Sequence, residues 1–351
     1  MKKSLLALAV LGAFAGAASA QSSVTLYGTV DLNGRYVKND GSSKRLSLSQ
    51  DGINSSQLGF RGIEDLGGGL KAGFNLLAGV NADTGTTNSK FFNRRSTLSL
   101  FSGAGELRLG RDYVPTFWND TIFDAFGTNG LGDSSHVGQL LTSTFVRADN
   151  SIGYFLPSNI GGFYGQAMVA AGEGGVVSAT AANPGRYYGA RIGFAAGPFD
   201  VAISGASQRY AFATGTIPSG GNQKTYNIGG SYDFGFMKLL GYLDRDSAPS
   251  RRETRGSISA VVPFGQSEIH LGYDRSKLTR DGLTPSSNTV SQYAATYQYN
   301  LSKRTAMYGT AAMLKNGSIS SNGVAGGSSI AAAPTPGGDS KGFELGVRHF
   351  F

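Results

Sequence analysis

The chain has 351 residues, a formal net charge of +8 and no cysteine. The absence of thiols excludes disulfide scaffolds and thiolate metal sites, and the basic charge suits a partner that is a small anion or an anionic surface. The 53 glycines, 16 tyrosines and 21 phenylalanines favour many short strands with tight turns over a helical fold.

The first twenty residues differ in pattern from the rest of the chain. Two lysines follow the first methionine, an apolar stretch runs from Leu5 to Phe14, and small residues end at Ala20. This order is typical of a secretory signal peptide, and it is too short for a membrane anchor. We therefore predict that residues 1–20 are cleaved off and that residues 21–351 form the mature protein.

Polar and apolar residues alternate with a period of two through the mature chain. The first such segment runs from Leu26 to Asn33, and the last runs from Phe343 to Arg348. Alternation of this kind indicates half-buried strands, because neighbouring side chains on a strand point to opposite faces. No apolar run after Ala20 is long enough for a transmembrane helix.

The connections between these segments are alternately short and long. Seven are tight turns, such as Glu64–Gly67 and Ser102–Gly105, and eight are longer polar stretches. Fifteen connections predict sixteen strands, and roughly 21 residues per strand and connection suit a strand of about ten residues that crosses a bilayer. The long stretches cover residues 38–52, 81–90, 112–146, 173–185, 211–222, 245–254, 278–288 and 315–341.

Short turns on one side and long loops on the other are typical of outer-membrane proteins. An open sheet edge is very costly in lipid, so the sheet must close, and sixteen strands enclose a water-filled channel. The sequence therefore predicts an all-β fold: one sixteen-stranded antiparallel transmembrane β-barrel over residues 21–351. The longest connection, residues 112–146, carries Phe117 and Trp118 among its apolar residues, and these favour packing against the inner wall.

Several short motifs, in order along the whole mature chain, resemble the general trimeric porins of proteobacteria. Among these porins, the motifs resemble most the β-proteobacterial branch, which has anion-selective members. The resemblance implies a homotrimer of sixteen-stranded barrels, each with its third loop folded inward. The motifs are Leu26-Tyr27-Gly28, Leu58–Gly62, Glu64–Ala72, Leu109-Gly110-Arg111, Asp149–Ile152 and Arg348–Phe351.

In such porins a ladder of basic side chains on the wall faces acidic groups on the inward loop. By motif, the ladder positions fall on Gln57, Arg95 and Arg147, of which the first is neutral. The loop acid of the family corresponds to Ala125 here, with Asp124 one place earlier. Strand alternation independently places Arg95 and Arg147 on the inward face, so we expect both at the constriction of the pore.

Other charged residues are candidates for the same constriction. A charge on the lipid face at mid-bilayer would cost ~2–4 kcal/mol, so basic residues within strands are expected to point inward. The three acids of the long loop either face the basic wall or are ordinary solvated loop residues. The further basic candidates are Arg35, Arg61, Lys71 and Arg108, and the loop acids are Asp120, Asp124 and Asp133.

These residues predict a channel for passive diffusion of small hydrophilic solutes that is weakly to moderately anion-selective. Guanidinium groups stay charged at any working pH, and a narrow lumen with low-dielectric walls concentrates their field. One alternative is a substrate-specific channel for a small carboxylate or phosphate anion. The sequence leaves both open.

An enzyme is the main rival from another functional class. His270 shares a strand face with Glu268 and Asp274, which suggests a base–carboxylate pair or part of a metal site. Residues two apart on a strand are, however, ~6.6 Å apart, and no evident nucleophile accompanies them. We interpret His270 as a lumen-lining residue and expect no enzyme activity, no cofactor and no metal.

The predicted location is the bacterial outer membrane. A plugged receptor would need about 22 strands, and this chain is too short for that. Expected partners are outer-membrane lipid and lipopolysaccharide, small anions and other hydrophilic solutes, and two further copies of the chain. The terminal Phe351 resembles the signal read by the barrel assembly machinery, and a secreted chain is not expected to meet nucleic acid.

Overall fold

The computed structural model describes residues 23–140, 145–172, 185–209, 221–325 and 332–351. The predicted signal peptide and parts of four long connections lie outside these ranges. None of the helices in the described ranges is long and apolar enough to cross a membrane. Antiparallel strands make up most of the described chain, as the alternation predicts.

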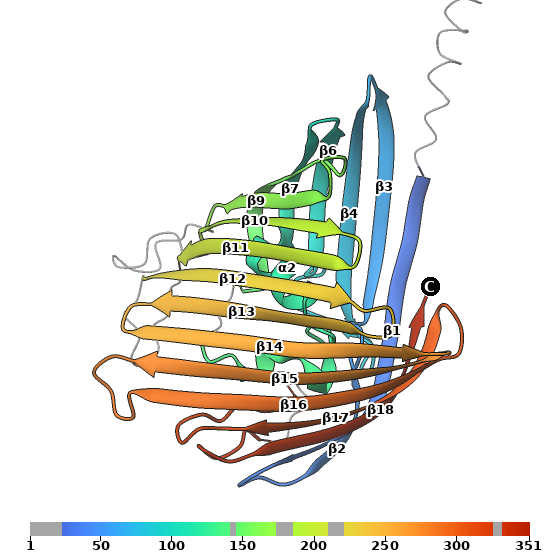
Figure 1. Cartoon of the computed structure of the whole chain (residues 1–351). Coiled ribbons are helices and arrows are strands. Elements are labelled where there is room, and N and C mark those ends of the chain that lie inside the picture. Colours follow the sequence, from blue (N-terminus) through green and yellow to red (C-terminus); the bar gives the residue numbers. More distant parts are fainter. Residues whose placement is uncertain (1–22, 141–144, 173–184, 210–220, 326–331) are drawn as a thin grey trace, which may run out of the picture.

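The strands pair antiparallel in one continuous sheet (Figure 1). In chain order they are β1 (Ser23–Asn39), β2 (Arg45–Gln50), β3 (Gln57–Gly67), β4 (Leu70–Asn81), β5 (Thr86–Thr87), β6 (Arg95–Ser102), β7 (Gly105–Tyr113), β8 (Arg147–Phe155), β9 (Phe163–Ala170), β10 (Tyr187–Ala196), β11 (Phe199–Arg209), β12 (Asn222–Asp233), β13 (Lys238–Ala248), β14 (Arg251–Phe264), β15 (Ser267–Arg280), β16 (Ser287–Asn300), β17 (Thr305–Lys315) and β18 (Ser340–Phe350). The helices are α2 (Pro115–Ile122), η1 (Gly130–Gly132) and η2 (Ser134–Val137).

Seventeen of these eighteen strands make up a closed barrel of sixteen staves, because two of them share one stave. β1 pairs with β2 through one half and with β3 through the other, so β2 and β3 are two pieces of one stave. β5 has two residues and pairs only with the end of β4. β1 also pairs with β18, from Thr29 opposite Phe350 to Asn39 opposite Ser340, and this closes the sheet. The predicted sixteen-stranded antiparallel barrel is confirmed.

Each strand presents an apolar face outward and a polar face inward. On β12, Tyr226 and Ile228 are exposed on the outside, whereas Thr225 and Asn227 are buried on the inside. This distribution is the reverse of a soluble β-sandwich and is typical of a barrel that has lipid around it and polar groups within.

Three predicted long connections are shorter in the structure. The stretch 38–52 contains β2, so that only residues 40–44 connect β1 to β2. The stretch 245–254 contains only a two-residue turn, because β13 continues to Ala248 and β14 begins at Arg251. The stretch 278–288 shrinks to residues 281–286. These predictions were wrong because polar and charged residues there continue the antiparallel pairing of the strands.

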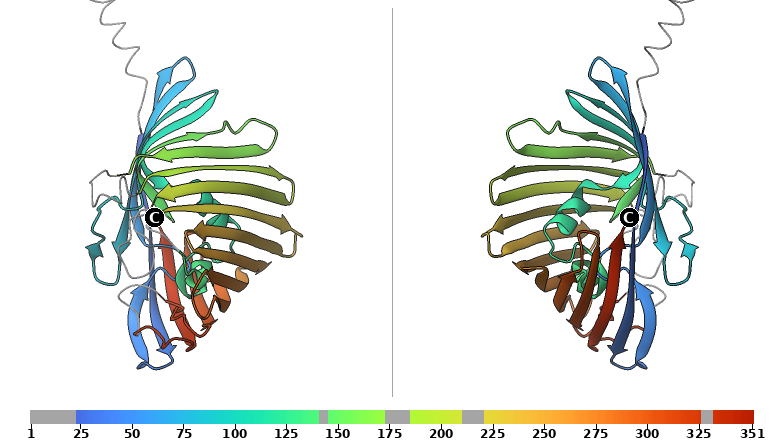
Figure 2. Two further views of the ribbon diagram at one scale, coloured as in Figure 1. Left: turned by 90° about the vertical axis from the view of Figure 1, so that its left-hand side faces the viewer. Right: turned by 90° about the vertical axis from the view of Figure 1, so that its right-hand side faces the viewer.

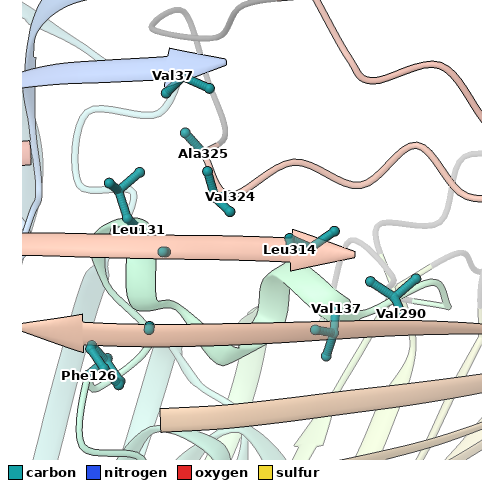
Figure 3. Packing of buried hydrophobic residues seen from close by; sticks show 10 residues of the cluster. Val37, Phe126, Leu131, Val137, Val290, Leu314, Val324 and Ala325 are labelled. Carbon is teal, nitrogen blue, oxygen red and sulfur yellow. The ribbon is translucent and has the colours of Figure 1, made fainter. Parts of the chain in front are cut away.

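The largest apolar cluster lies inside the barrel, between the wall and the connection from β7 to β8. Residues 114–140 and 145–146, which we call the inner loop, contribute Phe126, Leu131 and Val137 to this cluster. Val37 of β1 and Leu314 of β17 pack against them (Figure 3). The inner loop is therefore folded into the barrel, where Figure 2 shows its green helical segment enclosed by strands.

Candidate functional site: a loop-narrowed lumen

One side of the inner loop is fixed to the wall by a buried polar network. From α2, Asn119 donates to the Asn227 Oδ1 on β12 at 2.8 Å. Asp120 lies 3.3 Å from the Arg255 guanidinium on β14, and Arg255 also forms an ion pair with Asp244 on β13. Arg255 is only 1% exposed. Asp246 lies 3.6 Å from the same guanidinium. We call these four residues the clamp: Asp120, Asp244, Asp246 and Arg255.

Two further contacts hold the loop backbone. The Glu253 carboxylate on β14 accepts hydrogen bonds from the N–H groups of Gln139 and Leu140, both at 2.8 Å. His270 on β15 donates from Nδ1 to the Ala125 carbonyl oxygen at 2.7 Å. Buried backbone groups need such partners, so these bonds fix the position of the loop in the lumen.

A cavity of about 1070 Å³ remains between the inner loop and the opposite wall. We call it the waist cavity. It brings together all three predicted ladder positions and two of the three predicted loop acids. The wall contributes Gln57, Arg94, Arg95, Tyr113, Arg147, Glu268, His270 and Arg348, and the loop contributes Trp118, Asp124, Ala125, Phe126 and Asp133, among others.

Two arginines of this wall lie against one tyrosine ring, that of Tyr113. The Arg147 guanidinium donates to the Tyr113 hydroxyl at 2.9 Å and lies 4.3 Å from the ring centroid. Arg95 lies 5.4 Å from the same centroid, and its Nε donates to Asp112 at 2.7 Å. Within the described ranges, Arg147 makes no ion pair, so its charge is not neutralised by a carboxylate in contact with it.

A β-bulge interrupts the alternation of β8 between Ser151 and Arg147, so alternation does not explain why Arg147 lines the cavity. This bulge separates Ala148, which lies opposite the inward Asp112, from Ser151, which lies opposite Gly110. Asn150 within the bulge has φ of 53°, a conformation that asparagine tolerates well. The bulge shifts the phase of the strand, so an unbroken alternation from Ser151 to Arg147 was the wrong argument, although Arg147 does line the lumen.

Two arginines of the waist cavity were missed in the sequence. Arg94 directly precedes β6, so strand alternation does not apply to it. Arg348 lies on β18 in phase with the fully buried Glu344, and alternation in the last segment would have placed it inside. In the described ranges neither forms an ion pair, and Arg348 donates to the Asn54 side-chain oxygen at 3.0 Å.

The other predicted basic residues do not line the waist cavity. Arg35 is buried and pairs with Glu344 at 2.8 Å, beside a second cavity of about 630 Å³ toward the long connections. Arg108 is paired with both Glu106 and Asp112. The remaining two, Arg61 and Lys71, are exposed and lie toward the tight turn between β3 and β4. Alternation gives the direction of a side chain but not its height in the pore, and this limits such predictions.

The three loop acids differ in position. Asp120 is buried in the clamp and lines neither cavity, while Asp133 lines both. Asp124 lines the waist cavity and accepts hydrogen bonds from the N–H groups of Phe126 at 3.0 Å and Thr128 at 3.1 Å. Burial raises the pKa of the Asp124 carboxyl to about 6. Asp124 and Asp133 therefore line the cavity that the arginines also line. Asp120 instead holds the inner loop to the wall through its ion pair with Arg255.

A closed sixteen-stranded barrel with an apolar exterior and a polar lumen narrowed by an inner loop defines a channel protein of the outer membrane. Known proteins agree with this class. Residues 7–318 match the Gram-negative porin family. The chain is 38% identical to outer membrane porin protein 32 of Delftia acidovorans over the full length of both, and 30% identical to an outer membrane porin of Bordetella pertussis over 90% of this chain and 95% of that one.

Solved structures give the same result. The anion-selective porin from Comamonas acidovorans superimposes with a TM-score of 0.82 at 35% identity, covering 94% of this chain and 100% of that one. A trimer form of OmpT of Vibrio cholerae shares the fold, with a TM-score of 0.69 at 14% identity over 94% and 99% of the two chains. The chain belongs to the Gram-negative porin family: it is an outer-membrane porin that forms a passive diffusion channel.

Proposed function

We propose that this porin conducts small hydrophilic solutes with a weak to moderate preference for anions. The observation that carries the proposal is the wall of the waist cavity, where Arg94, Arg147 and Arg348 make no ion pair within the described ranges. The likeness to a porin that is itself named anion-selective supports the same selectivity.

The balance of charges determines how strong the preference should be. Four arginines line the waist cavity against the three carboxylates of Asp124, Asp133 and Glu268. The net excess of positive charge is therefore small, and this favours a modest selectivity for anions. A unit charge ~5 Å from an ion at a dielectric of about 80 contributes ~0.8 kcal/mol, or about fourfold in occupancy. The arrangement of bases on the wall and acids on the loop also creates a transverse field.

The reversal potential under a salt gradient tests this function. The mature porin is inserted into a planar bilayer with KCl at 0.1 M on one side and 0.01 M on the other. We expect a potential whose sign reports chloride preference. The preference should fall at 1 M salt, where screening shortens to ~3 Å. A cation-selective sign at low salt would contradict the proposal.

A substrate-specific anion channel is the second candidate. Arg94, Arg147 and Arg348 line the waist cavity without an ion pair in the described ranges, and planar guanidinium groups suit a carboxylate or phosphate. Titration of the KCl current with small carboxylates and with inorganic phosphate separates the two candidates. A specific channel is blocked at low concentration by its own solute, whereas a general channel is not.

We also propose targeting and assembly steps for this chain. Cleavage after Ala20 should leave Gln21 as the first residue, which N-terminal sequencing of protein from outer membranes tests. The mature chain should form a homotrimer, as the trimer form of the similarly folded Vibrio protein suggests. Analytical ultracentrifugation in detergent that detects only monomers would contradict this.

Phe351 is proposed to act in assembly more than in conduction. Its backbone N–H donates to the Gly28 carbonyl oxygen at 3.1 Å, and the Gly28 N–H donates back to Phe351 at 3.1 Å, next to the seam where β1 meets β18. Deletion of Phe351 should lower the yield in the outer membrane while the surviving pores conduct normally. Normal insertion of the shortened chain would contradict this role.

We infer further that the chain has no catalytic activity. Its relatives are porins, which are channels rather than enzymes. His270, the residue that most resembled a catalytic base, supports the loop backbone through its bond to Ala125. Purified protein should therefore not hydrolyse ester or phosphoester substrates above background.

A further inference from the structure

At two places on the lumen wall, a glycine lies directly against a phenylalanine ring of the inner loop. A Cβ atom on Gly229 of β12 would lie 2.2 Å from the Phe123 ring, and one on Gly272 of β15 would lie 2.6 Å from the Phe126 ring. Carbon atoms in contact are normally ~3.5–4.0 Å apart, so any larger residue at either position would overlap with the ring. We call Gly229 with Phe123 the buried seat, and Gly272 with Phe126 the waist seat.

The wall around the waist seat also fixes the loop backbone next to the ring. Gly272 lies opposite Ser259 of β14 and two positions after His270 on β15. The Ala125 N–H donates to the Ser259 hydroxyl at 2.9 Å, and His270 donates to the Ala125 carbonyl oxygen at 2.7 Å. The backbone immediately before Phe126 is therefore held on both sides, and its ring occupies the gap that Gly272 leaves in the wall.

The Phe126 ring is enclosed on the wall side and on the loop side (Figure 3). On the loop side it lies against Gly132, where a Cβ atom would be only 2.1 Å from the ring. His270 lies edge-on to the ring, with 6.2 Å between the centroids. Phe126 nevertheless lines the waist cavity, whereas Phe123 is fully buried and lines neither cavity. A displaced Phe126 ring therefore has room only toward the waist.

We propose that Gly272 sets the size limit of the channel, because it lets the Phe126 ring lie against the wall instead of in the waist. In the described chain Gly272 does not itself line the waist cavity, so it acts through Phe126 as a positioning residue. Overpacking a filled site forces its neighbours to shift. A methyl group at position 272 should thus narrow the waist, and removal of the ring should widen it. The inference needs only a diffusion channel, not its preference for anions.

The test measures the conductance of single pores in 1 M KCl and the swelling of liposomes in sugars of increasing size. Screening shortens to ~3 Å at 1 M salt, so this conductance reports the width of the pore more than its charge. Gly272→Ala should lower the conductance and slow the uptake of the larger sugars severalfold, with the smallest sugar affected least. Gly256→Ala on the neighbouring β14 is the matched control, because its Cβ would meet the nearest side chain at an ordinary 3.5 Å.

A second variant tests the same seat from the loop. Phe126→Ala should raise the conductance and admit larger sugars than the parent does. The double variant Gly272→Ala with Phe126→Ala should behave as Phe126→Ala alone, because the three atoms nearest to a Cβ at position 272 all belong to the Phe126 ring. This lack of additivity separates positioning of the ring from a general disturbance of the wall.

Two results would overturn the role of Gly272. One is an unchanged or larger size limit in Gly272→Ala protein that keeps the β-sheet circular dichroism of the parent. The other is an unchanged size limit in Phe126→Ala, which keeps the test valid if Gly272→Ala folds poorly. Both variants should keep the sign of the parent's reversal potential at 0.1 M salt, since neither changes a charge. The size limit and the anion preference therefore fail separately.

Discussion

The arginine of the clamp and the arginines of the waist cavity differ in burial and in the carboxylates around them. In the clamp, Arg255 is 1% exposed and lies among the three carboxylates of Asp120, Asp244 and Asp246. On the opposite side, Arg147 faces the waist cavity, and its partner is the hydroxyl of Tyr113. Arginine therefore contacts the inner loop on one side of the pore and lines the open cavity on the other, where we propose that it acts on solute.

The difference follows from the cost of burying charge. A buried ion must be paired and hydrogen-bonded, because removing one partner leaves an uncompensated charge in a medium that solvates it poorly. An arginine beside a water-filled cavity has no such need and can keep its field for passing ions. Three carboxylates surround Arg255, one contacts Arg95, and none contacts Arg147 within the described ranges. We propose that this difference separates an arginine that holds the loop from arginines that act on passing ions.

The largest expected effect is from breaking the clamp. Arg255→Met leaves three buried carboxylates without their cation, and breaking a buried pair in this way costs about 3–5 kcal/mol. The inner loop should detach, and liposome swelling should then show uptake of larger sugars than the parent admits. Asp120→Asn, which keeps the shape and removes one charge, should have a smaller effect. An unchanged size limit in Arg255→Met would contradict the role of the clamp.

A smaller effect is expected from Asp124, which lies in the loop and faces the arginine side. Burial raises its pKa to about 6, so the carboxyl gains a proton as pH falls from 8 to 5 and the cavity loses one negative charge. Anion preference should therefore rise on acidification, by up to about fourfold for a charge ~5 Å away. Asp124→Asn should lack this step in the reversal potential. The same pH step in the variant would assign the titration to another group.

The smallest effect is expected at the buried pair of Arg35 and Glu344, which lies outside the waist cavity. The double variant Arg35→Met and Glu344→Gln removes both charges and leaves the net charge unchanged. Replacing a buried ion pair by groups of similar volume is often close to neutral for stability. The reversal potential should stay at the parent value, and a clear shift would mean that this pair contributes to selectivity.

The alternation of residues was sufficient for the barrel, because lipid outside and polar groups inside impose a period of two on every strand. The prediction of the connections failed where a polar segment was interpreted as a loop. At 245–254 the charged residues continue two paired strands, with Asp246 and Glu253 buried on the inside and Arg245 and Arg252 exposed on the outside. A count of polar residues cannot separate a loop from a strand that is polar on both faces, whereas the positions of Asp244 and Arg245 in the ladder can.

The candidate site was predicted in part. Motif and alternation found Arg95, and the motif found Arg147 although a bulge invalidated the alternation argument. Arg94 lies just before its strand, where periodicity carries no information. The ion pairs of Arg108 with Glu106 and Asp112 lie within β7. The partner of Asp120 could not be predicted, because only the folded barrel brings Asp120 into contact with Arg255, 135 positions later in the chain.

The central claim is that the arginine wall of the waist cavity sets anion preference. It is tested most directly by the reversal potential of Arg95→Ala with Arg147→Ala beside the parent, at 0.1 M and 1 M salt. Two unit charges ~5 Å from an ion at a dielectric near 80 contribute about 1.7 kcal/mol, which is more than tenfold in occupancy. The account predicts that the double variant moves toward the neutral potential at 0.1 M and that the two proteins converge at 1 M. Parent-like selectivity of the double variant at 0.1 M would contradict it.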